Sequence, residues 1–280
     1  MSKIEERLMN AVREGIAQDR LPLPTLPEVA LRIQELARDR NVSASRMASE
    51  IARDPATAAR LLRIANSSAQ RALRKIDNLQ MAVARLGIDL TSNIVTSLTM
   101  AQLFRARSEG VGRYLKASWV RSQEVAAMAH VMAAHFTVLK PELAMLAGLT
   151  HEIGVLPILR LADDFPEIND DPAALQRVIE KLHPRTGCLV LRVWNFPPEI
   201  IDVPMLHLDL TRRHDGPADY ADVVTVANLQ GHVGRDTALA KVDRSRVPAF
   251  EKLDISPEVD VLEGGDIGDE LQESYSLLAA

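Results

Sequence analysis

The sequence is poor in cysteine and in aromatic residues. It has one cysteine, Cys188, and aromatic residues make up 4% of the chain. One cysteine excludes an internal disulfide framework and a cysteine-based zinc site, and it favours a reducing compartment such as the cytoplasm. The scarcity of aromatic residues, beside abundant Ala, Leu, Val and Ile, favours helices packed on helices over a β-sandwich.

Long apolar segments and a strong positive charge are also missing. No run reaches the roughly 18 apolar residues of a membrane span, and the N-terminal segment Met1–Arg7 has acidic residues in place of a signal peptide's apolar core. The net charge is −5, and no recognition helix or set of stacking aromatics stands out. We therefore expect a cytoplasmic protein without a membrane partner, and the sequence disfavours nucleic acid as a partner.

Helical periodicity runs through the 280 residues, whereas strand-like alternation is absent. Two Asp-Pro pairs, Asp54–Pro55 and Asp171–Pro172, are typical helix starts, and Gly87 is a typical helix end. The pattern predicts an all-α fold made of two packed helical lobes.

The expected domain organisation has three parts. Residues 1–19 form an N-terminal helix or extension, and residues 20–235 form the main domain, divided into lobes at 20–110 and 111–235. Gly110 and Gly112 are the expected joint and hinge between these lobes. Residues 236–280 form an acidic, mostly helical segment, in which Ser256–Glu258 starts the last helical stretch and Gly264–Gly265 interrupts it.

Basic residues outnumber acidic ones between residues 32 and 75, which suggests two interpretations. The simpler one is a set of solvated helix faces. The other is a docking surface for an anionic partner, with Arg53, Arg60, Arg63 and Asn66 as its candidate residues. For Asn66 we favour a role in ending the preceding helix over a role as a polar hook.

The segment Gly148–Gly154, with sequence GLTHEIG, carries the strongest chemical signal. A histidine beside a carboxylate, His151–Glu152, is a pattern with which hydrolases hold a divalent metal. An interior histidine is also commonly a hydrogen-bonded core residue, and this is the interpretation we favour for His151.

Several short segments in a fixed order resemble the HDOD family, the "HD-related output domain" of bacterial signalling proteins. The resemblance covers roughly residues 20–235. It implies an all-helical, two-lobed HD-like fold and a relationship to HD-type phosphohydrolases, in which His and Asp residues hold one or two metals. The segments that carry it are Leu23–Pro27, Ile51–Pro55, Leu61–Ser67, Ala82–Gly87, Trp119 with Ser122, Gly148–Gly154, His183 with Gly187, and Trp194–Pro197.

Compared with such enzymes, this chain has fewer residues that can bind a metal. The resemblance implies a vestigial or alternative metal site at His151, Glu152, His183 and His207. Glu in place of Asp moves the carboxylate by about 1.5 Å, and an ion pair between Glu152 and Arg121 is expected instead. Arg121, Leu208 and Asn228 stand where further ligands belong. The remaining histidines, His130, His135, His214 and His232, lack partners at metal spacing and are expected to be surface or packing residues.

The function we expect is that of a non-catalytic regulatory module, without a cofactor, which contacts a signalling protein or a small anionic ligand. The alternative is a divergent phosphohydrolase that uses one divalent metal (Mn, Fe, Mg or Zn). A third hypothesis is a scaffold that binds partners through its arginine-rich lobe.

Overall fold

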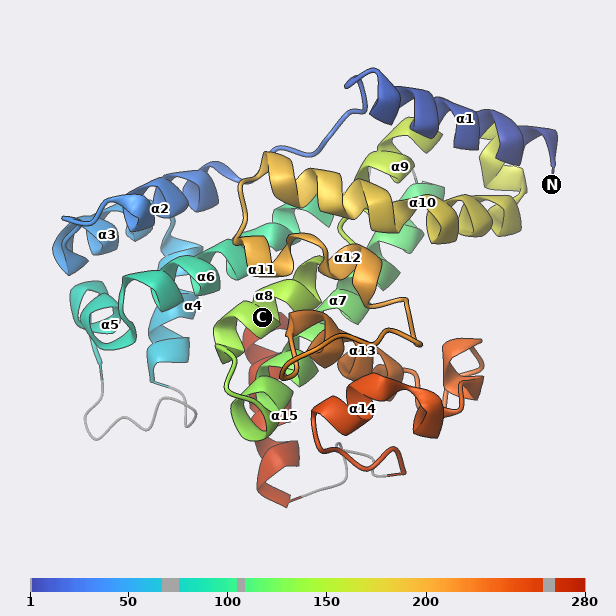
Figure 1. Cartoon of the computed structure of the whole chain (residues 1–280). Coiled ribbons are helices and arrows are strands. Elements are labelled where there is room, and N and C mark those ends of the chain that lie inside the picture. The colour runs from blue at the N-terminus through green and yellow to red at the C-terminus, as the bar shows by residue number, and fades with distance from the viewer. Residues whose placement is uncertain (1, 67–75, 105–108, 259–264, 280) are drawn as a thin grey trace.

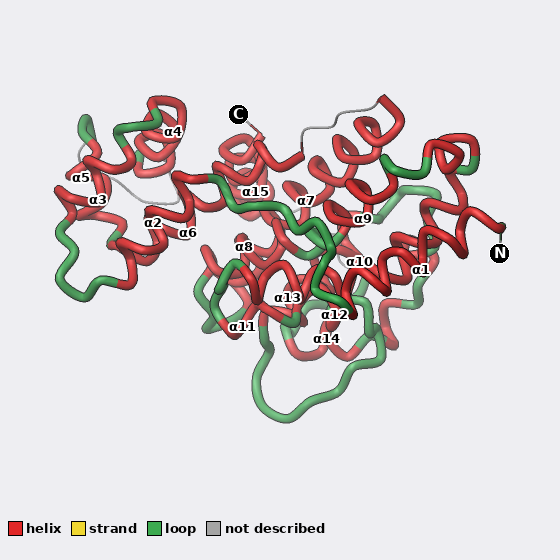
Figure 2. Tube along the Cα trace, turned by 90° about the horizontal axis from the view of Figure 1, so that it is seen from above, coloured by secondary structure: helices red, strands yellow, loops and turns green. Residues whose placement is uncertain are grey.

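The computed structural model describes residues 2–66, 76–104, 109–258 and 265–279, and within these ranges it contains helices and turns but no strand. The prediction of an all-α fold is confirmed. Figures 1 and 2 show α2 to α6 gathered at one side of the molecule and the remaining helices at the other.

The first lobe is built from short helices whose apolar stripes meet in one core. Asp54 caps α4 through its side chain, Pro55 occupies the first turn, and Gly87 ends α5 with a positive φ of 83°, as their sequence signals predict. The helices are α2 (Glu28–Arg38), α3 (Ala44–Ile51), α4 (Pro55–Ala65), α5 (Leu79–Leu86) and α6 (Ile88–Thr99), followed by the 3-10 turn η2 (Met100–Phe104).

The second lobe surrounds the long helix α7, against which α8, α13 and α15 pack. Its core is separate from that of the first lobe, and Met145 contacts both cores. The helices are α7 (Glu109–Phe136), α8 (Pro141–Thr150), α9 (Val155–Ala162), α10 (Pro172–Val193), α11 (Pro198–Ile201), α12 (Val203–Leu206), α13 (Tyr220–Gly231) and α14 (Pro248–Lys252), with 3-10 turns η3 (Pro166–Asp170), η4 (Leu239–Lys241) and η5 (Arg244–Arg246).

Both terminal helices belong to the second lobe. Helix α1 (Lys3–Ala17) packs on α10 through Leu8, Met9 and Val12, and the buried Glu5 pairs with Arg177 at 3.0 Å. The C-terminal helix α15 (Gly265–Ala279) lies along α7, and Gln123 donates a hydrogen bond of 2.6 Å to the carbonyl of Leu278. The acidic C-terminal segment is thus docked rather than extended.

Three local expectations concern glycines and helix ends. Gly110 and Gly112, the expected hinge, lie in the first turns of α7. Pro257 and Glu258, where a helix was expected to start after Ser256, form a turn, and residues 259–264 lie outside the described residues. Helix α15 begins at Gly265, and Gly264 lies outside the described residues, so the interruption expected at these glycines stays a prediction.

The segment Pro141–Ala162 is the most apolar helical region. Its length and mean hydropathy of 1.4 would suit a membrane span, but 89% of its most apolar window is buried inside the protein. This burial is typical of a core helix in a protein of this size.

Candidate functional site

The two glycines of the GLTHEIG segment permit close helix packing. A Cβ atom at Gly148 would lie 2.7 Å from the Cα of Ala126 in α7, and one at Gly154 would lie 2.0 Å from the carbonyl oxygen of His183 in α10. Backbone atoms cannot yield at such distances without moving a helix. The glycines therefore bring α8 against α7, and the start of α9 against α10, on either side of His151.

Three histidines predicted to belong to the site lie together and share one hydrogen-bonding pattern. The ring of His207 lies 5.1 Å from that of His151 and 6.4 Å from that of His183, measured between centroids. Each Nδ1 faces a backbone carbonyl of its own turn: Gly148 at 2.6 Å, Ile179 at 2.8 Å and Val203 at 2.9 Å for His151, His183 and His207, respectively. Because a carbonyl only accepts, each Nδ1 carries the proton and each Nε2 presents a lone pair.

Burial keeps these rings neutral. It is the main cause that lowers the pKa of His151 and His183, and it places the pKa of His207 well below its ordinary value, with the neighbouring His151 adding to the effect. The Nε2 atoms of His151 and His183 are buried and have no hydrogen-bond partner. The cluster is therefore a buried polar group in which two imidazole acceptors are unused.

The carboxylate of Glu152 is held by α7. Its Oε1 lies 3.7 Å from the Arg121 guanidinium, and its Oε2 accepts a hydrogen bond of 3.1 Å from the Ser118 hydroxyl. Burial raises the pKa of Glu152, but the electrostatic effects of His151, Arg121 and His183, together with the Ser118 hydrogen bond, outweigh it, so the net pKa lies below the ordinary value. Glu152 is ionised and already neutralised by a protein cation.

The other two positions that depart from the expected ligand pattern differ in exposure. Asn228 on α13 is buried, and its Oδ1 has no hydrogen-bond partner. Leu208 follows α12 and is 36% exposed, so it faces solvent rather than the histidine cluster. Two further buried atoms on α7 also lack a hydrogen-bond partner: the hydroxyl oxygen of Ser122 and the Nε of Arg121. The unpaired polar atoms include both donors and acceptors.

The four candidate ligands do not converge as a metal requires. Within the described residues, one group of three His, Cys, Asp or Glu side chains has ligand atoms all within 4.8 Å of one another, and it contains none of His151, Glu152, His183 or His207. Ligands on one ion with bonds of about 2.0–2.2 Å lie closer together than that. With Arg121 beside the carboxylate, the residues present do not fit a preformed metal centre.

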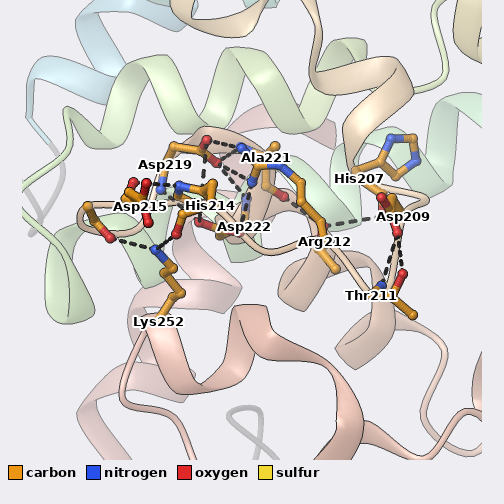
Figure 3. A network of polar contacts seen from close by, with 12 residues as sticks. His207, Asp209, Thr211, Arg212, His214, Asp215, Asp219, Ala221, Asp222 and Lys252 are labelled. Atoms are coloured by element: carbon orange, nitrogen blue, oxygen red, sulfur yellow. Dashed lines mark hydrogen bonds and ion pairs between the residues drawn. The ribbon is translucent and has the colours of Figure 1, made fainter.

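The group that does converge, His214, Asp219 and Asp222, caps a helix (Figure 3). Asp219 and Asp222 form a capping box at the start of α13, and Arg212 pairs with both carboxylates. His214 Nε2 lies 2.8 Å from Asp222. The expectation that His214 lacks partners at metal spacing is wrong; Asp219 three residues before Asp222 was the available signal. Arg212 already supplies the positive charge here.

The four residues of the candidate partner surface on the first lobe differ in exposure and in the partners they already have. Arg53 and Arg63 are exposed, Arg53 pairs with Glu50 at 3.2 Å, and Arg60 is half-buried. Asn66 ends α4, and its side-chain amide bonds the carbonyls of Leu62 and Ile76 at 2.8 Å each. Asn66 is a helix cap, as we favoured, and its amide is not presented to solvent as a hook.

Comparison with known proteins gives one family and several similar structures. A family model described as the HDOD domain matches residues 23–209. A candidate metal-dependent phosphohydrolase from Shewanella amazonensis SB2B is 30% identical, over 99% of this chain and 100% of that one, with a TM-score of 0.85. An HDOD domain protein of unknown function from Geobacter sulfurreducens is 22% identical, over 98% and 97% of the two chains, with a TM-score of 0.64. No curated protein matches.

A third structure has a different label. A candidate signal transduction protein from Marinobacter aquaeolei VT8 is 20% identical, over 94% of this chain and 61% of its own, with a TM-score of 0.63. At this identity the likeness concerns the fold alone.

Proposed function

Since this chain belongs to the HDOD domain family, we propose that it is a non-catalytic regulatory module of bacterial signal transduction in the cytoplasm. It acts by contacting a signalling protein or a small anionic ligand, and it needs no metal. One observation carries this proposal: the Arg121 guanidinium neutralises Glu152, the carboxylate that a metal would need, at 3.7 Å. A fixed guanidinium cannot ligate a metal and repels one.

The regulatory mechanism is a population shift between arrangements of the two lobes. Two observations support it: each lobe has its own buried core, and α6 and α8 lie between them with Met145 touching both. We keep Gly110 and Gly112 as the proposed hinge, now as weak points at the start of α7, since glycine lowers helix stability by about 0.5–1 kcal/mol relative to alanine.

A phosphodiester assay tests the absence of catalysis. The protein is incubated with bis(p-nitrophenyl) phosphate and with Mn²⁺, Fe²⁺, Mg²⁺ or Zn²⁺ in turn, beside the variant His151→Ala. We expect the same background release of nitrophenol from both proteins. Turnover by the unmodified protein that disappears in His151→Ala would establish an enzyme instead.

One observation favours the alternative, a divergent metal-dependent phosphohydrolase. The Nδ1 hydrogen bonds of His151, His183 and His207 leave each Nε2 free to ligate, as in many metal sites. The protein from Shewanella amazonensis carries a candidate phosphohydrolase label. Against this alternative stand the spread of the ligand atoms and the charge of Arg121.

The third hypothesis, a scaffold that binds through the arginine-rich lobe, predicts a different mutational pattern. Charge reversal at Arg60 and Arg63 would abolish capture of an acidic partner, whereas substitutions at His151 or His183 would leave capture unchanged. If the partner instead binds near the histidine cluster, substitutions at His151 or His183 would abolish capture and charge reversal at Arg60 and Arg63 would leave it unchanged.

A further inference from the structure

Two adjoining pockets lie beyond the histidine cluster, between the 209–216 turn and the segment that leads into α14. Thr211, Arg213, Arg246 and Pro248 line the first, which has a volume of about 420 Å³. The second, of about 180 Å³, shares Arg213, Arg246 and Pro248 and adds Glu251 and an apolar wall that includes Phe250, Ile255 and Pro257. The two arginines therefore stand between both pockets.

Arg213 and Arg246 have no carboxylate of their own. Neighbouring Arg212 pairs with Asp219 and Asp222, and Arg244 bonds Gln230, but the side chains of Arg213 and Arg246 make no hydrogen bond or ion pair within the part of the chain that the structure describes. Both side chains are exposed. Two guanidiniums that share a pocket without a counter-ion repel one another, and an anion between them removes that cost.

The backbone under each arginine is fixed. Asp209 accepts hydrogen bonds from the backbone N–H and the hydroxyl of Thr211, two residues before Arg213. Asp243 accepts the same two hydrogen bonds from Ser245, which directly precedes Arg246. Lys252 on α14 reaches across to the carbonyl of His214 at 2.8 Å and joins the two segments (Figure 3). A backbone held in this way reduces the conformational entropy that the two segments lose when a ligand binds.

The linings of the pockets indicate the class of ligand. No carboxylate lines the first pocket, so it suits a phosphate group, which guanidiniums bind with paired N–H donors. The second pocket combines an apolar wall with Glu251, a carboxylate that accepts hydrogen bonds from an amino group. We propose that this double pocket binds a nucleoside phosphate, with the phosphate between Arg213 and Arg246 and an amino-bearing base beside Glu251.

The site is independent of the histidine cluster, although one segment connects them. Residues 207–219 run from the buried His207 to the cap of α13, and Thr225 bonds the carbonyl of His207 at 3.2 Å. Arg213 belongs to this segment of residues 207–219, so a ligand that draws Arg213 toward Arg246 would also pull on the segment. Binding here needs neither a metal nor catalysis, so it stands or falls separately from the function proposed above.

Isothermal titration calorimetry with three probes tests the site: AMP, adenosine and inorganic phosphate. We expect AMP to bind more tightly than phosphate, and adenosine to bind weakest because it lacks the charge. The variant Arg213→Ala/Arg246→Ala loses two charged contacts, which weakens AMP binding by about a hundredfold. Glu251→Gln weakens AMP but leaves phosphate binding unchanged.

Arg40→Ala is the matched control, because Arg40 is exposed on the other lobe and lines neither pocket. It should bind AMP as the unmodified protein does. All replaced side chains are exposed, and an unchanged unfolding temperature confirms that the variants are folded. No AMP binding at millimolar concentration, or binding that survives the double substitution, overturns the proposal; equal affinity for AMP and phosphate overturns the base contact.

Discussion

Arg121 on α7 and Glu152 beside α8 form an ion pair of 3.7 Å across the most extensive helix interface in the protein. The Arg121 side chain is 36% exposed and that of Glu152 19% exposed, so the pair lies at the edge of the buried histidine cluster. Charge at this point holds two core helices together.

Loss of the Arg121 charge should destabilise the fold. Arg121→Met leaves Glu152 without its cation, and a half-buried charge that loses its partner costs about 1–3 kcal/mol. We expect a lower urea midpoint, and a partial recovery when Glu152→Gln removes the remaining charge. Arg113→Met, at an exposed position of the same helix, is the control and should leave the midpoint in place. An unchanged midpoint for Arg121→Met would show that the pair has no structural role.

Gly154 should tolerate no side chain. The Cβ of Gly154→Ala would lie 2.0 Å from the carbonyl oxygen of His183, so the start of α9 would have to move away from α10. Overpacking of this kind costs about 1–3 kcal/mol or more, measured by denaturant unfolding. Gly231→Ala provides the contrast, because its Cβ meets the flexible end of Met128 at 3.0 Å. Equal stability of the two variants would contradict the packing role given to the GLTHEIG segment.

Glu5 should contribute to the acid sensitivity of the protein. Its hydrogen bond with Arg177 is the main cause that lowers the pKa of this buried carboxyl below 4.5. A carboxyl with a lowered folded-state pKa stabilises the protein above its unfolded pKa, and that stability is lost as pH falls through the folded pKa. Unfolding free energy should therefore decline below about pH 4.5. In Glu5→Gln this decline should be shallower; an identical pH profile would exclude the contribution.

The C-terminal helix should detach when its anchor is changed. Leu278 is 6% exposed and packs in the core of the second lobe. Leu278→Asp buries an unpaired charge, so α15 should leave α7 and its amides should exchange with deuterium much faster. Gln272→Asp, exposed on the same helix, should keep the slow exchange. Slow exchange in Leu278→Asp would mean that other contacts hold α15.

The fold was more predictable than the site, for reasons that particular residues illustrate. Asp54–Pro55 and Gly87 act through local backbone chemistry, so their sequence signals were sufficient. Pro184 lies inside α10, which continues to Val193; burial on both sides of the proline outweighs its cost to the helix. No sequence window contains that tertiary contribution, and an interior proline by itself favours the end of a helix.

The site depends on contacts that no spacing encodes. The resemblance pointed to His151, His183 and His207 and to the pairing of Glu152 with Arg121. The backbone carbonyls that fix the three imidazoles follow from three-dimensional placement, and the approach of His214 to Asp222 has a sequence signal only in the capping pair Asp219 and Asp222. Residue types were predictable, whereas their exact geometry was not.

The metal content of the purified protein tests the central claim most directly. The protein is dialysed against Mn²⁺, Fe²⁺ and Zn²⁺ in separate experiments, passed through a desalting column and analysed by inductively coupled plasma mass spectrometry. With Arg121 neutralising Glu152 and the imidazoles spread apart, we predict far less than one ion per chain, and the same content in His151→Ala. One ion per chain that is lost in His151→Ala would contradict the account.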